Sequence, residues 1–181
     1  MTRYVALLRA INVAGHARIP TAELALLFTA AGALDVTSCG HAGNLLFSAR
    51  RGAAAAIVAR VRDELGRRQG DRPVIVLRTA AELTALANAQ PFVGCRAAPG
   101  DKWYVTFLTR KPRIEPSLPL ESAVERITVV ERRGREVLLL SGPKRSGFYG
   151  LPNSFVETAY GVAATTRNWS TVTRLAKRLA S

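Results

Sequence analysis

The chain has 181 residues, of which 48% are apolar and 22% are charged, as in an ordinary globular protein. On folding, a chain of this length removes about 70% of its extended surface from water, so its core needs neither disulfides nor a structural metal. No apolar run approaches the roughly 20 residues of a membrane-spanning helix. Arg9 interrupts the apolar opening before it could act as a signal peptide, so the sequence predicts a cytoplasmic protein without a membrane segment.

Basic residues outnumber acidic ones by 26 to 13, and the resulting net charge of +13 favours anionic partners. The excess is spread along the chain, because residues 1–90 hold 11 basic and 6 acidic side chains while residues 91–181 hold 15 and 7. The basic clusters are short. Each of them alone is typical of a solvated loop or helix end.

Apolar residues at helical spacing follow Pro20 and recur from residue 54 to residue 65, which predicts two helices in the first half. Ion pairs four residues apart are expected on the second of them. These pairs are Arg60 with Glu64, Asp63 with Arg67, and Glu64 with Arg68. The predicted elements are a strand at 4–11, a loop at 12–17, a helix at 20–31, strands at 34–39 and 45–49, a helix at 54–68 and a strand at 73–78.

This order of strand, helix, two strands, helix and strand is that of the split βαβ, or ferredoxin-like, unit. Its right-handed crossovers place the third strand between the first and the second. The loop 12–18 and the turn 40–44 would then lie at the same end of the sheet. Asn12 would approach Gly43 and Asn44 there.

The second half is less regular, and neither a linker nor an internal repeat is visible in its letters. We therefore predict an α+β fold in which two associated ferredoxin-like halves, 1–79 and 80–181, form one compact body. The predicted elements of the second half are a helix at 80–89, a strand at 102–109, a hairpin of 127–131 and 136–140, a loop at 141–150, and closing helices at 154–160 and from 165 onward.

Four blocks of the sequence, at 4–15, 19–24, 43–47 and 164–169, carry a resemblance to a known family. The chain resembles the domain-of-unknown-function family numbered 1697. The resemblance implies a bacterial α+β protein of two intertwined ferredoxin-like halves, with no established activity. The chain departs from the family pattern at residues 41 and 42, where His-Ala replaces Gln-Ser, so a hydroxyl and an amide are missing from that turn.

The loop pair 12–18 and 40–44 is the first candidate site, because it would lie beside the amino terminus of the helix that follows Pro20. Exposed N–H groups and the helix dipole attract anions at such a place. Alternatively, its glycines and asparagines only close turns. The candidate ligand-binding residues are Arg9, Asn12, Gly15, His16, Gly43 and Asn44.

The block 165–169, Thr-Thr-Arg-Asn-Trp, is predicted to open the last helix, with Thr or Asn as the cap and Trp169 as an anchor in the core. Arg167 could instead hold a phosphate or carboxylate through its planar guanidinium. No acidic residue follows Glu157. Besides Arg167 and Asn168, the secondary basic candidates are Arg145, Arg174 and Arg178.

A metal site is not expected, because Cys39 and Cys95 lie 56 positions apart and His16 and His41 are the only histidines. We expect both cysteines to be reduced and buried, and we predict no cofactor. Cys39 and His41 stand two residues apart, so a nucleophile pair is conceivable on one face of a strand.

Two functions follow from these features. In the first, basic faces bind an anionic ligand or a nucleic-acid backbone, with an affinity that salt weakens. In the second, the loop pair 12–18 and 40–44 binds or converts a small anionic metabolite, so both an enzyme and a binding protein are compatible with the sequence. Base stacking on strand aromatics, as in RNA-recognition motifs, is not expected, because Tyr4 and Phe47 are the only ones in the first half.

Overall fold

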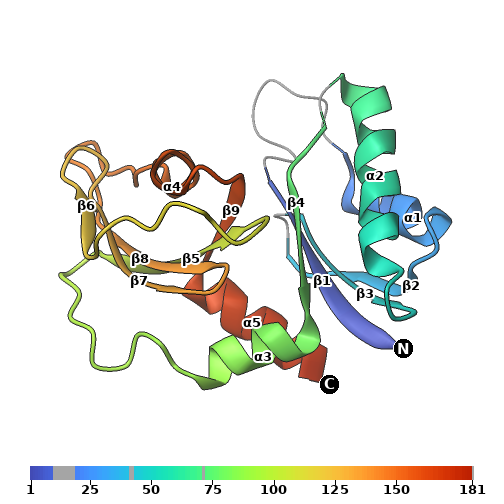
Figure 1. Ribbon diagram of the computed structural model, residues 1–181, viewed down its shortest axis with the longest axis horizontal. Helices are drawn as coiled ribbons and strands as arrows, with labels where there is room; N and C mark the ends of the chain where they lie inside the picture. Colours follow the sequence, from blue (N-terminus) through green and yellow to red (C-terminus); the bar gives the residue numbers. More distant parts are fainter. Residues whose placement is uncertain (10–18, 41–42, 71, 181) are drawn as a thin grey trace. The chain divides into compact units, whose positions relative to one another are not determined.

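The fold was determined from a computed structural model that describes residues 1–9, 19–40, 43–70 and 72–180. The chain divides into two compact units, the first formed by Met1–Ala85 with Leu175–Ser181 and the second by Leu86–Arg174. The described residues form five helices and two antiparallel sheets, of four and five strands (Figure 1). The predicted α+β class is confirmed.

The first unit is built on a sheet with the strand order β2-β3-β1-β4, so β3 lies between β1 and β2 as the element order predicts. Helices α1 and α2 cover the same face of this sheet (Figure 1). Within the described residues, β1 ends earlier than the predicted strand. The elements are β1 (Thr2–Leu8), α1 (Thr21–Ala30), β2 (Leu34–Ser38), β3 (Asn44–Ala49), α2 (Ala54–Gln69) and β4 (Ile75–Thr79).

The core of this unit lies between the sheet and the two helices. Successive side chains of a strand point to opposite faces, and Tyr4, Ala6 and Leu8 of β1 pack on the helical side. Phe47 of β3 stacks on Tyr4 with ring centroids 5.5 Å apart, and Phe28 of α1 packs against Phe47 at 5.4 Å. The apolar spacing read from the sequence therefore marks the face that is buried.

Two of the ion pairs expected on α2 are wrong. Arg60 donates a hydrogen bond to the carbonyl of Ala31 (2.9 Å) and makes no pair with Glu64. Asp63 pairs with Arg72 (3.3 Å) rather than with Arg67. Both side chains bind partners outside α2, because Ala31 follows α1 and Arg72 follows the end of α2. The spacing of residues within one helix does not predict such partners.

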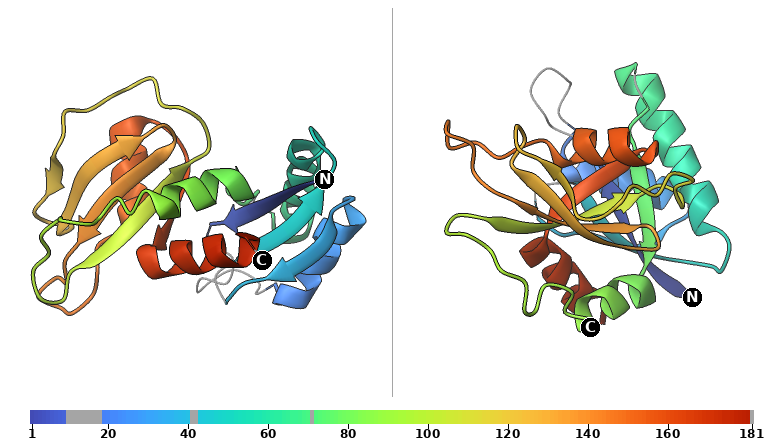
Figure 2. Two further views of the ribbon diagram at one scale, coloured as in Figure 1. Left: turned by 90° about the horizontal axis from the view of Figure 1, so that it is seen from below. Right: turned by 60° about the vertical axis from the view of Figure 1, so that its left-hand side comes forward.

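The second unit contains a sheet with the strand order β6-β7-β8-β5-β9. Helix α4 covers one face of it (Figure 2), where Val156 and Tyr160 pack against the sheet. Helices α3 and α5 each contribute residues to both units. The elements are α3 (Ala80–Asn88), β5 (Lys102–Leu108), β6 (Leu120–Ser122), β7 (Ile127–Arg133), β8 (Glu136–Ser141), α4 (Pro152–Tyr160), β9 (Ala164–Asn168) and α5 (Trp169–Ala180).

Residues 164–168 form strand β9, so the prediction that the block 165–169 opens the last helix is wrong for residues 165–167. β9 pairs antiparallel with β5, and the hydroxyls of Thr106 and Thr166 share a hydrogen bond (2.6 Å) across the two strands. β-Branched threonines fit a strand well. The helix begins only at Trp169, because pairing with a distant strand outweighs the local capping pattern.

The two sheets repeat one arrangement at their centres. In each, a central valine has a leucine opposite it on one neighbouring strand and an arginine opposite it on the other. The central strands also share Tyr-Val-x-x-Leu, at 4–8 and 104–108, a repeat too short to stand out in the letters. The matched positions are Val5, Leu46 and Arg78 in the first sheet and Val105, Leu138 and Arg167 in the second.

Candidate functional site

The described flanks of the predicted loop pair meet at one end of the first sheet. The N–H of Leu8 at the end of β1 donates to the carbonyl of Gly43 (2.8 Å), and the next N–H, that of Arg9, donates to the carbonyl of Val74 (2.9 Å). The approach of the loop 12–18 to this turn stays a prediction. Its candidates that lie outside the described residues are Asn12, Gly15 and His16, together with His41 of the turn.

Gly43 and Asn44 hold the turn itself. The side-chain amide of Asn44, 2% exposed, donates to the carbonyl of Cys39 (3.1 Å), and the N–H of Cys39 donates to the carbonyl of Asn44 (2.9 Å). Gly43 has a φ of +63°, a conformation that favours glycine, and an added Cβ would lie 3.1 Å from the Cβ of Leu8. These contacts support the turn-closing interpretation of both residues.

The two cysteines differ in their surroundings. Cys39 is buried, as expected, but Cys95 is exposed, so the prediction that both are buried is wrong for Cys95. Cys95 lies in the turns after α3, where its sulfur is 3.8 Å from the carbonyl of Pro91. Among the described residues, no group of three or more His, Cys, Asp and Glu side chains is arranged to hold a metal ion.

Arg167 is held inside the second unit. Its side chain is 9% exposed, and one guanidinium nitrogen donates to the hydroxyl of Thr165 and to the carbonyl of Thr166, both at 2.8 Å. Burial lowers the pKa of Arg167 to about 10. Arg78, at the matching position of the first sheet, is 1% exposed and likewise donates to the carbonyl of the preceding residue, Leu77 (2.8 Å). One such arginine in each sheet supports a structural role.

Asn168 and Trp169 fix the start of α5. The side-chain oxygen of Asn168 accepts a hydrogen bond from the N–H of Thr171 (2.9 Å), which is the expected cap. The ring of Trp169 meets Phe92 edge to face at 5.1 Å, and Phe92 stacks on Trp103 at 4.6 Å. Both contacts agree with the anchoring role that the sequence predicts for this block.

The cations at the end of α5 do not converge on a site. Arg178 is exposed, and its guanidinium donates to the carbonyl of Ser38 (3.4 Å). Arg3 donates to the carbonyls of Leu179 (2.9 Å) and Arg178 (3.2 Å), so β1 holds the end of this helix within the first unit. Arg174 is exposed, and no described residue forms a hydrogen bond or ion pair with its guanidinium.

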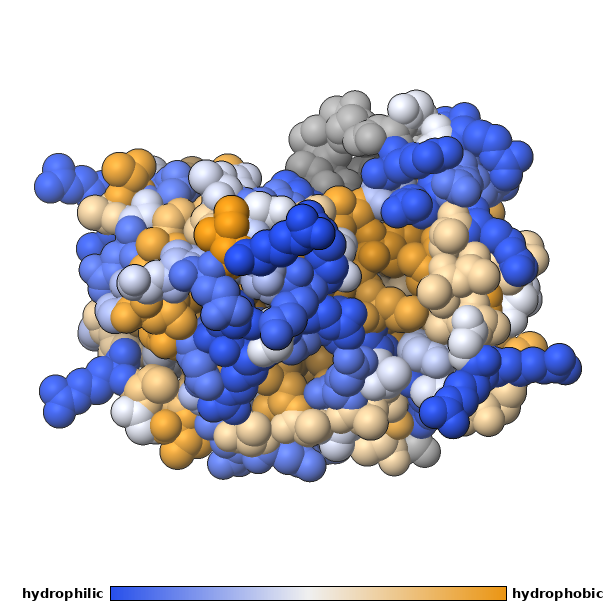
Figure 3. Space-filling view, viewed as in Figure 1, coloured by the Kyte–Doolittle hydropathy of each residue, from blue (hydrophilic) through white to orange (hydrophobic). Residues whose placement is uncertain are grey.

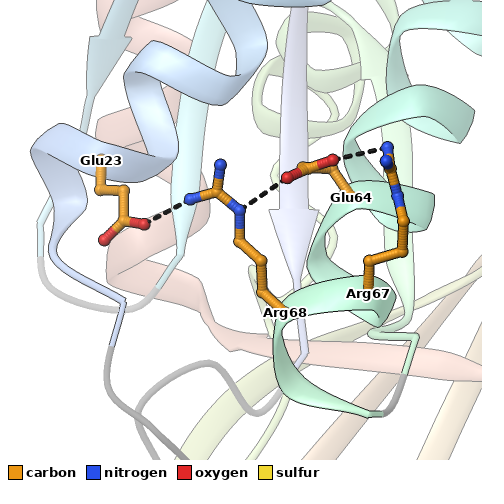
Figure 4. Close-up of polar contacts among 4 residues, drawn as sticks. All are labelled: Glu23, Glu64, Arg67 and Arg68. Atoms are coloured by element: carbon orange, nitrogen blue, oxygen red, sulfur yellow. Dashed lines mark hydrogen bonds and ion pairs between the residues drawn. The ribbon is translucent and has the colours of Figure 1, made fainter.

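Hydrophilic side chains project from much of the face drawn in Figure 3, so charge alone does not mark a site. Some basic clusters are neutralised. Arg68 pairs with Glu64 (2.7 Å) and with Glu23 of α1 (2.6 Å), while Arg67 pairs with Glu64 (2.5 Å) (Figure 4). The hydrogen bond from Arg68 to Glu64 lowers the pKa of Glu64 and raises the pKa of Arg68. This network joins α1 to α2 and leaves little attraction for an anion.

Two loops of the second unit, residues 122–126 and 142–151, form one braced surface that we call the two-loop platform. The carboxylate of Glu125 accepts a hydrogen bond from the N–H of Leu151 (2.9 Å) and pairs with the ammonium of Lys144 (3.0 Å). The N–H of Leu151, and after it Lys144, lower the pKa of Glu125. The charged carboxylate thus ties one loop to the other.

Backbone contacts brace the platform a second time. The N–H of Gly142 donates to the carbonyl of Arg126 (2.8 Å). Gly150 passes so close to the backbone of Glu125 that an added Cβ would overlap its carbonyl oxygen. The two loops are therefore held at both ends, and only glycine fits at the closest approach.

The second loop of the platform is a small hairpin. Pro143 and Tyr149 form an isolated β-bridge, and the N–H of Lys144 donates to the carbonyl of Phe148 (2.8 Å). The ammonium of Lys102 lies 4.1 Å from the centre of the Tyr149 ring, a cation–π distance. The hairpin is thus fixed on both sides of its tip at residues 145–147.

Three cations of the platform line one open cavity of about 470 Å³: Arg126, Lys144 and Arg145. Arg126 and Arg145 are exposed, and neither guanidinium forms a hydrogen bond or ion pair with any residue that the structure describes. Arg126 also borders a neighbouring cavity of about 330 Å³, together with Asp101 and Glu121. The platform is therefore one place where described cations gather without full neutralisation.

Sequence reasoning found only part of this surface. Arg145 is among the predicted candidates, but Arg126 is not, because it stands alone in a turn 19 positions away in sequence. One signal was present, since the basic pair 144–145 precedes a glycine and two aromatic residues at 147–149. The pairing of β7 with β8 brings the two loops together, and sequence spacing does not show it.

These features describe a mixed α+β protein with two antiparallel sheets and basic residues on the two-loop platform. The family model described as "Protein of unknown function (DUF1697)" matches residues 1–137, and the chain belongs to this family. The match ends before the second platform loop and before the block 164–169, although that block carried part of the resemblance seen in the sequence.

A solved structure has a similar fold. The conserved bacterial protein SP0830 from Streptococcus pneumoniae superposes with a TM-score of 0.71, covers 100% of this chain and 99% of its own, and is 19% identical. At this identity the likeness shows the fold alone. No curated protein matches the sequence. Among the described residues, no helix is long and apolar enough to cross a membrane.

Proposed function

We propose that the protein binds the phosphate backbone of a nucleic acid, or another polyanion, through the two-loop platform. One observation carries the proposal: Arg126, Lys144 and Arg145, from two braced loops, line a single open cavity. Cations held close together attract phosphates more strongly than scattered ones, and a fixed scaffold spares the entropy of gathering them.

The distribution of acidic partners supports this surface over the cluster 67–68 and over Arg167. Arg67 and Arg68 are paired with Glu64 and Glu23, and Arg167 is buried. On the platform only Lys144 has a carboxylate partner. We therefore expect Arg126 and Arg145 to make the direct phosphate contacts and Glu125 to hold Lys144 in place.

The binding test is a titration of fluorescein-labelled fifteen-nucleotide oligothymidylate, followed by fluorescence anisotropy. If the platform engages about three phosphates, affinity should fall about 20-fold between about 50 mM and about 200 mM salt. The double variant Arg126→Gln/Arg145→Gln should bind more weakly at low salt and show a shallower salt dependence. Arg50→Gln/Arg51→Gln is the matched control, because it removes two exposed cations of the first unit, and it should bind almost as the wild type does.

Two outcomes would overturn the proposal. One is the absence of any binding at low salt. The other is an equal loss in the platform variant and in the control, because that result would mean that net charge alone attracts the oligonucleotide.

A second candidate function is the binding of an anionic metabolite at the loop pair 12–18 and 40–44. The bond between Leu8 and Gly43 favours it, since the flanks of both loops meet there. A metabolite that binds the folded state raises the melting temperature. A rise that is equal in the wild type and in Arg126→Gln/Arg145→Gln would support this second function.

The strand orders also support the finer fold proposal, in which each unit is a ferredoxin-like half. The order β7-β8-β5-β9 corresponds to β2-β3-β1-β4 of the first unit, although residues 109–126 carry β6 where the first unit carries a helix. The order of predicted elements supports a boundary between the two halves near residue 79. The interruption of the apolar opening by Arg9 supports a cytoplasmic location.

A further inference from the structure

Phe148 is an apolar side chain that the fold leaves in water. Its side chain is 75% exposed, and its ring makes no contact with another aromatic ring in the described part of the chain. It lies on the platform hairpin, where its carbonyl accepts the N–H of Lys144 (2.8 Å). Folding therefore fixes the backbone of Phe148 without using the ring.

The neighbours of Phe148 hold it in position. Tyr149 donates its hydroxyl hydrogen to the carbonyl of Gly100 (2.6 Å) and pairs with Pro143 through the β-bridge. The ammonium of Lys102 lies over the Tyr149 ring. A ring presented on a fixed hairpin loses little entropy when a ligand covers it.

The same hairpin carries the cations of the platform. Lys144 and Arg145 precede Phe148 by four and three residues, and Arg126 lines the same cavity as both cations. Proteins that bind single-stranded nucleic acid combine cations that follow the backbone with aromatic rings on which bases stack. In a duplex, the bases already stack on one another and offer no free face.

We propose that the platform binds single-stranded nucleic acid, with an unpaired base stacked on Phe148 and phosphates on Arg126 and Arg145. The inference rests on the proposed function and adds the class of ligand to it. Stacking here uses a loop aromatic of the second unit, so it differs from the strand-aromatic mode that the first half lacks.

The shape of the platform, and not its other apolar side chains, favours a base over a lipid surface. Val124 and Leu151 are 80% and 66% exposed, so apolar exposure is not confined to the ring. Surfaces that lie on membranes usually present a helix with a continuous apolar face, and this surface is a hairpin beside a turn.

The test compares two probes of equal charge. One is fluorescein-labelled fifteen-nucleotide oligothymidylate, and the other is an abasic oligomer of the same length, which keeps the sugar-phosphate chain but has no bases. Stacking on one aromatic ring should make the wild type bind oligothymidylate about tenfold more tightly than the abasic oligomer. Phe148→Ala should remove this difference by weakening only the binding of oligothymidylate, and Phe148→Trp should restore it.

Val93→Ala is the matched control, because it shortens an apolar side chain that is 76% exposed outside the platform, and it should leave the tenfold difference intact. Equal binding of the two probes by the wild type would overturn the inference and leave the proposed function standing. If neither probe binds at low salt, both fail. Tight binding to phosphatidylglycerol vesicles that both Phe148→Ala and Val124→Ala weaken, with no difference between the two oligomers, would identify a membrane surface instead.

Discussion

Arg167→Ala should lower the free energy of unfolding by about 3 kcal/mol, because it removes a buried donor and leaves a cavity. The side chain is 9% exposed and donates to the Thr165 hydroxyl and the Thr166 carbonyl. Arg78→Ala should cost a similar amount, since Arg78 occupies the matching position of the first sheet. Arg174→Ala, at an exposed position of α5, should change stability by no more than about 0.5 kcal/mol.

Arg167→Met separates the packing of this side chain from its charge. Burial lowers the pKa of Arg167 from its usual value to about 10, so the charged guanidinium is a cost to the fold at neutral pH. Between the lower pKa of Arg167 in the folded chain and its usual pKa in the unfolded chain, the unfolded chain binds more protons than the folded one. The free energy of unfolding therefore increases as the pH rises through this range. Methionine keeps the aliphatic packing without the charge, so its loss should be smaller than that of alanine.

Urea unfolding at neutral pH measures all four variants. The structural account is contradicted if Arg167→Ala is as stable as Arg174→Ala. If that stable variant also lost the binding of oligothymidylate, Arg167 would be an anion-binding residue, as the sequence allowed.

Gly150→Ala should lower the free energy of unfolding by about 2 kcal/mol and weaken the binding of oligothymidylate. The added Cβ would overlap the carbonyl oxygen of Glu125, and backbone of this kind yields only by moving one loop away from the other. Such a movement would also disturb the bond from Leu151 to Glu125 and the pairing with Lys144. The platform would then lose the arrangement that gathers its cations.

Gly147→Ala is the control for this prediction. Gly147 has a φ of +79°, but no atom lies within 4 Å of an added Cβ, so only the conformational cost of about 1 kcal/mol applies. Stability and binding are measured by urea unfolding and by anisotropy. Indistinguishable results for Gly150→Ala and Gly147→Ala would contradict the close approach of the two loops.

The first unit could be predicted from the sequence because its signals are local. Leu24 and Phe28 recur at helical spacing in α1, and Ile57, Val61 and Leu65 do the same in α2, where all of them are buried. Each helix is long enough for its apolar residues to recur at helical spacing at least twice. The observed strand boundaries differ from the predicted ones by a few residues, because pairing across the sheet decides where a strand ends.

Strand β9 could not be predicted in the same way. Thr165, Thr166 and Asn168 look like helix caps in front of Trp169, and one of them, Asn168, is a cap. What makes the preceding residues a strand is β5, about 60 positions earlier in the chain, which supplies the partner hydrogen bonds. No local pattern records a partner at that distance.

The platform escaped the sequence analysis for a related reason. Arg126 and Arg145 belong to different loops, and the pairing of β7 with β8 brings those loops together. Phe148 is conspicuous only once its exposure is known, because an aromatic residue in a sequence is more often part of the core. Arg167, by contrast, drew attention as a lone cation near the end of the chain, although the fold buries it.

The most direct test of the platform as the polyanion site is a backbone amide NMR titration of the protein with fifteen-nucleotide oligothymidylate at low salt. The account predicts that the largest shift changes fall in residues 122–126 and 142–151, with smaller changes around Lys102. Changes centred on the turn at Gly43 and Asn44, with the platform unaffected, would contradict it and favour a site at the loop pair.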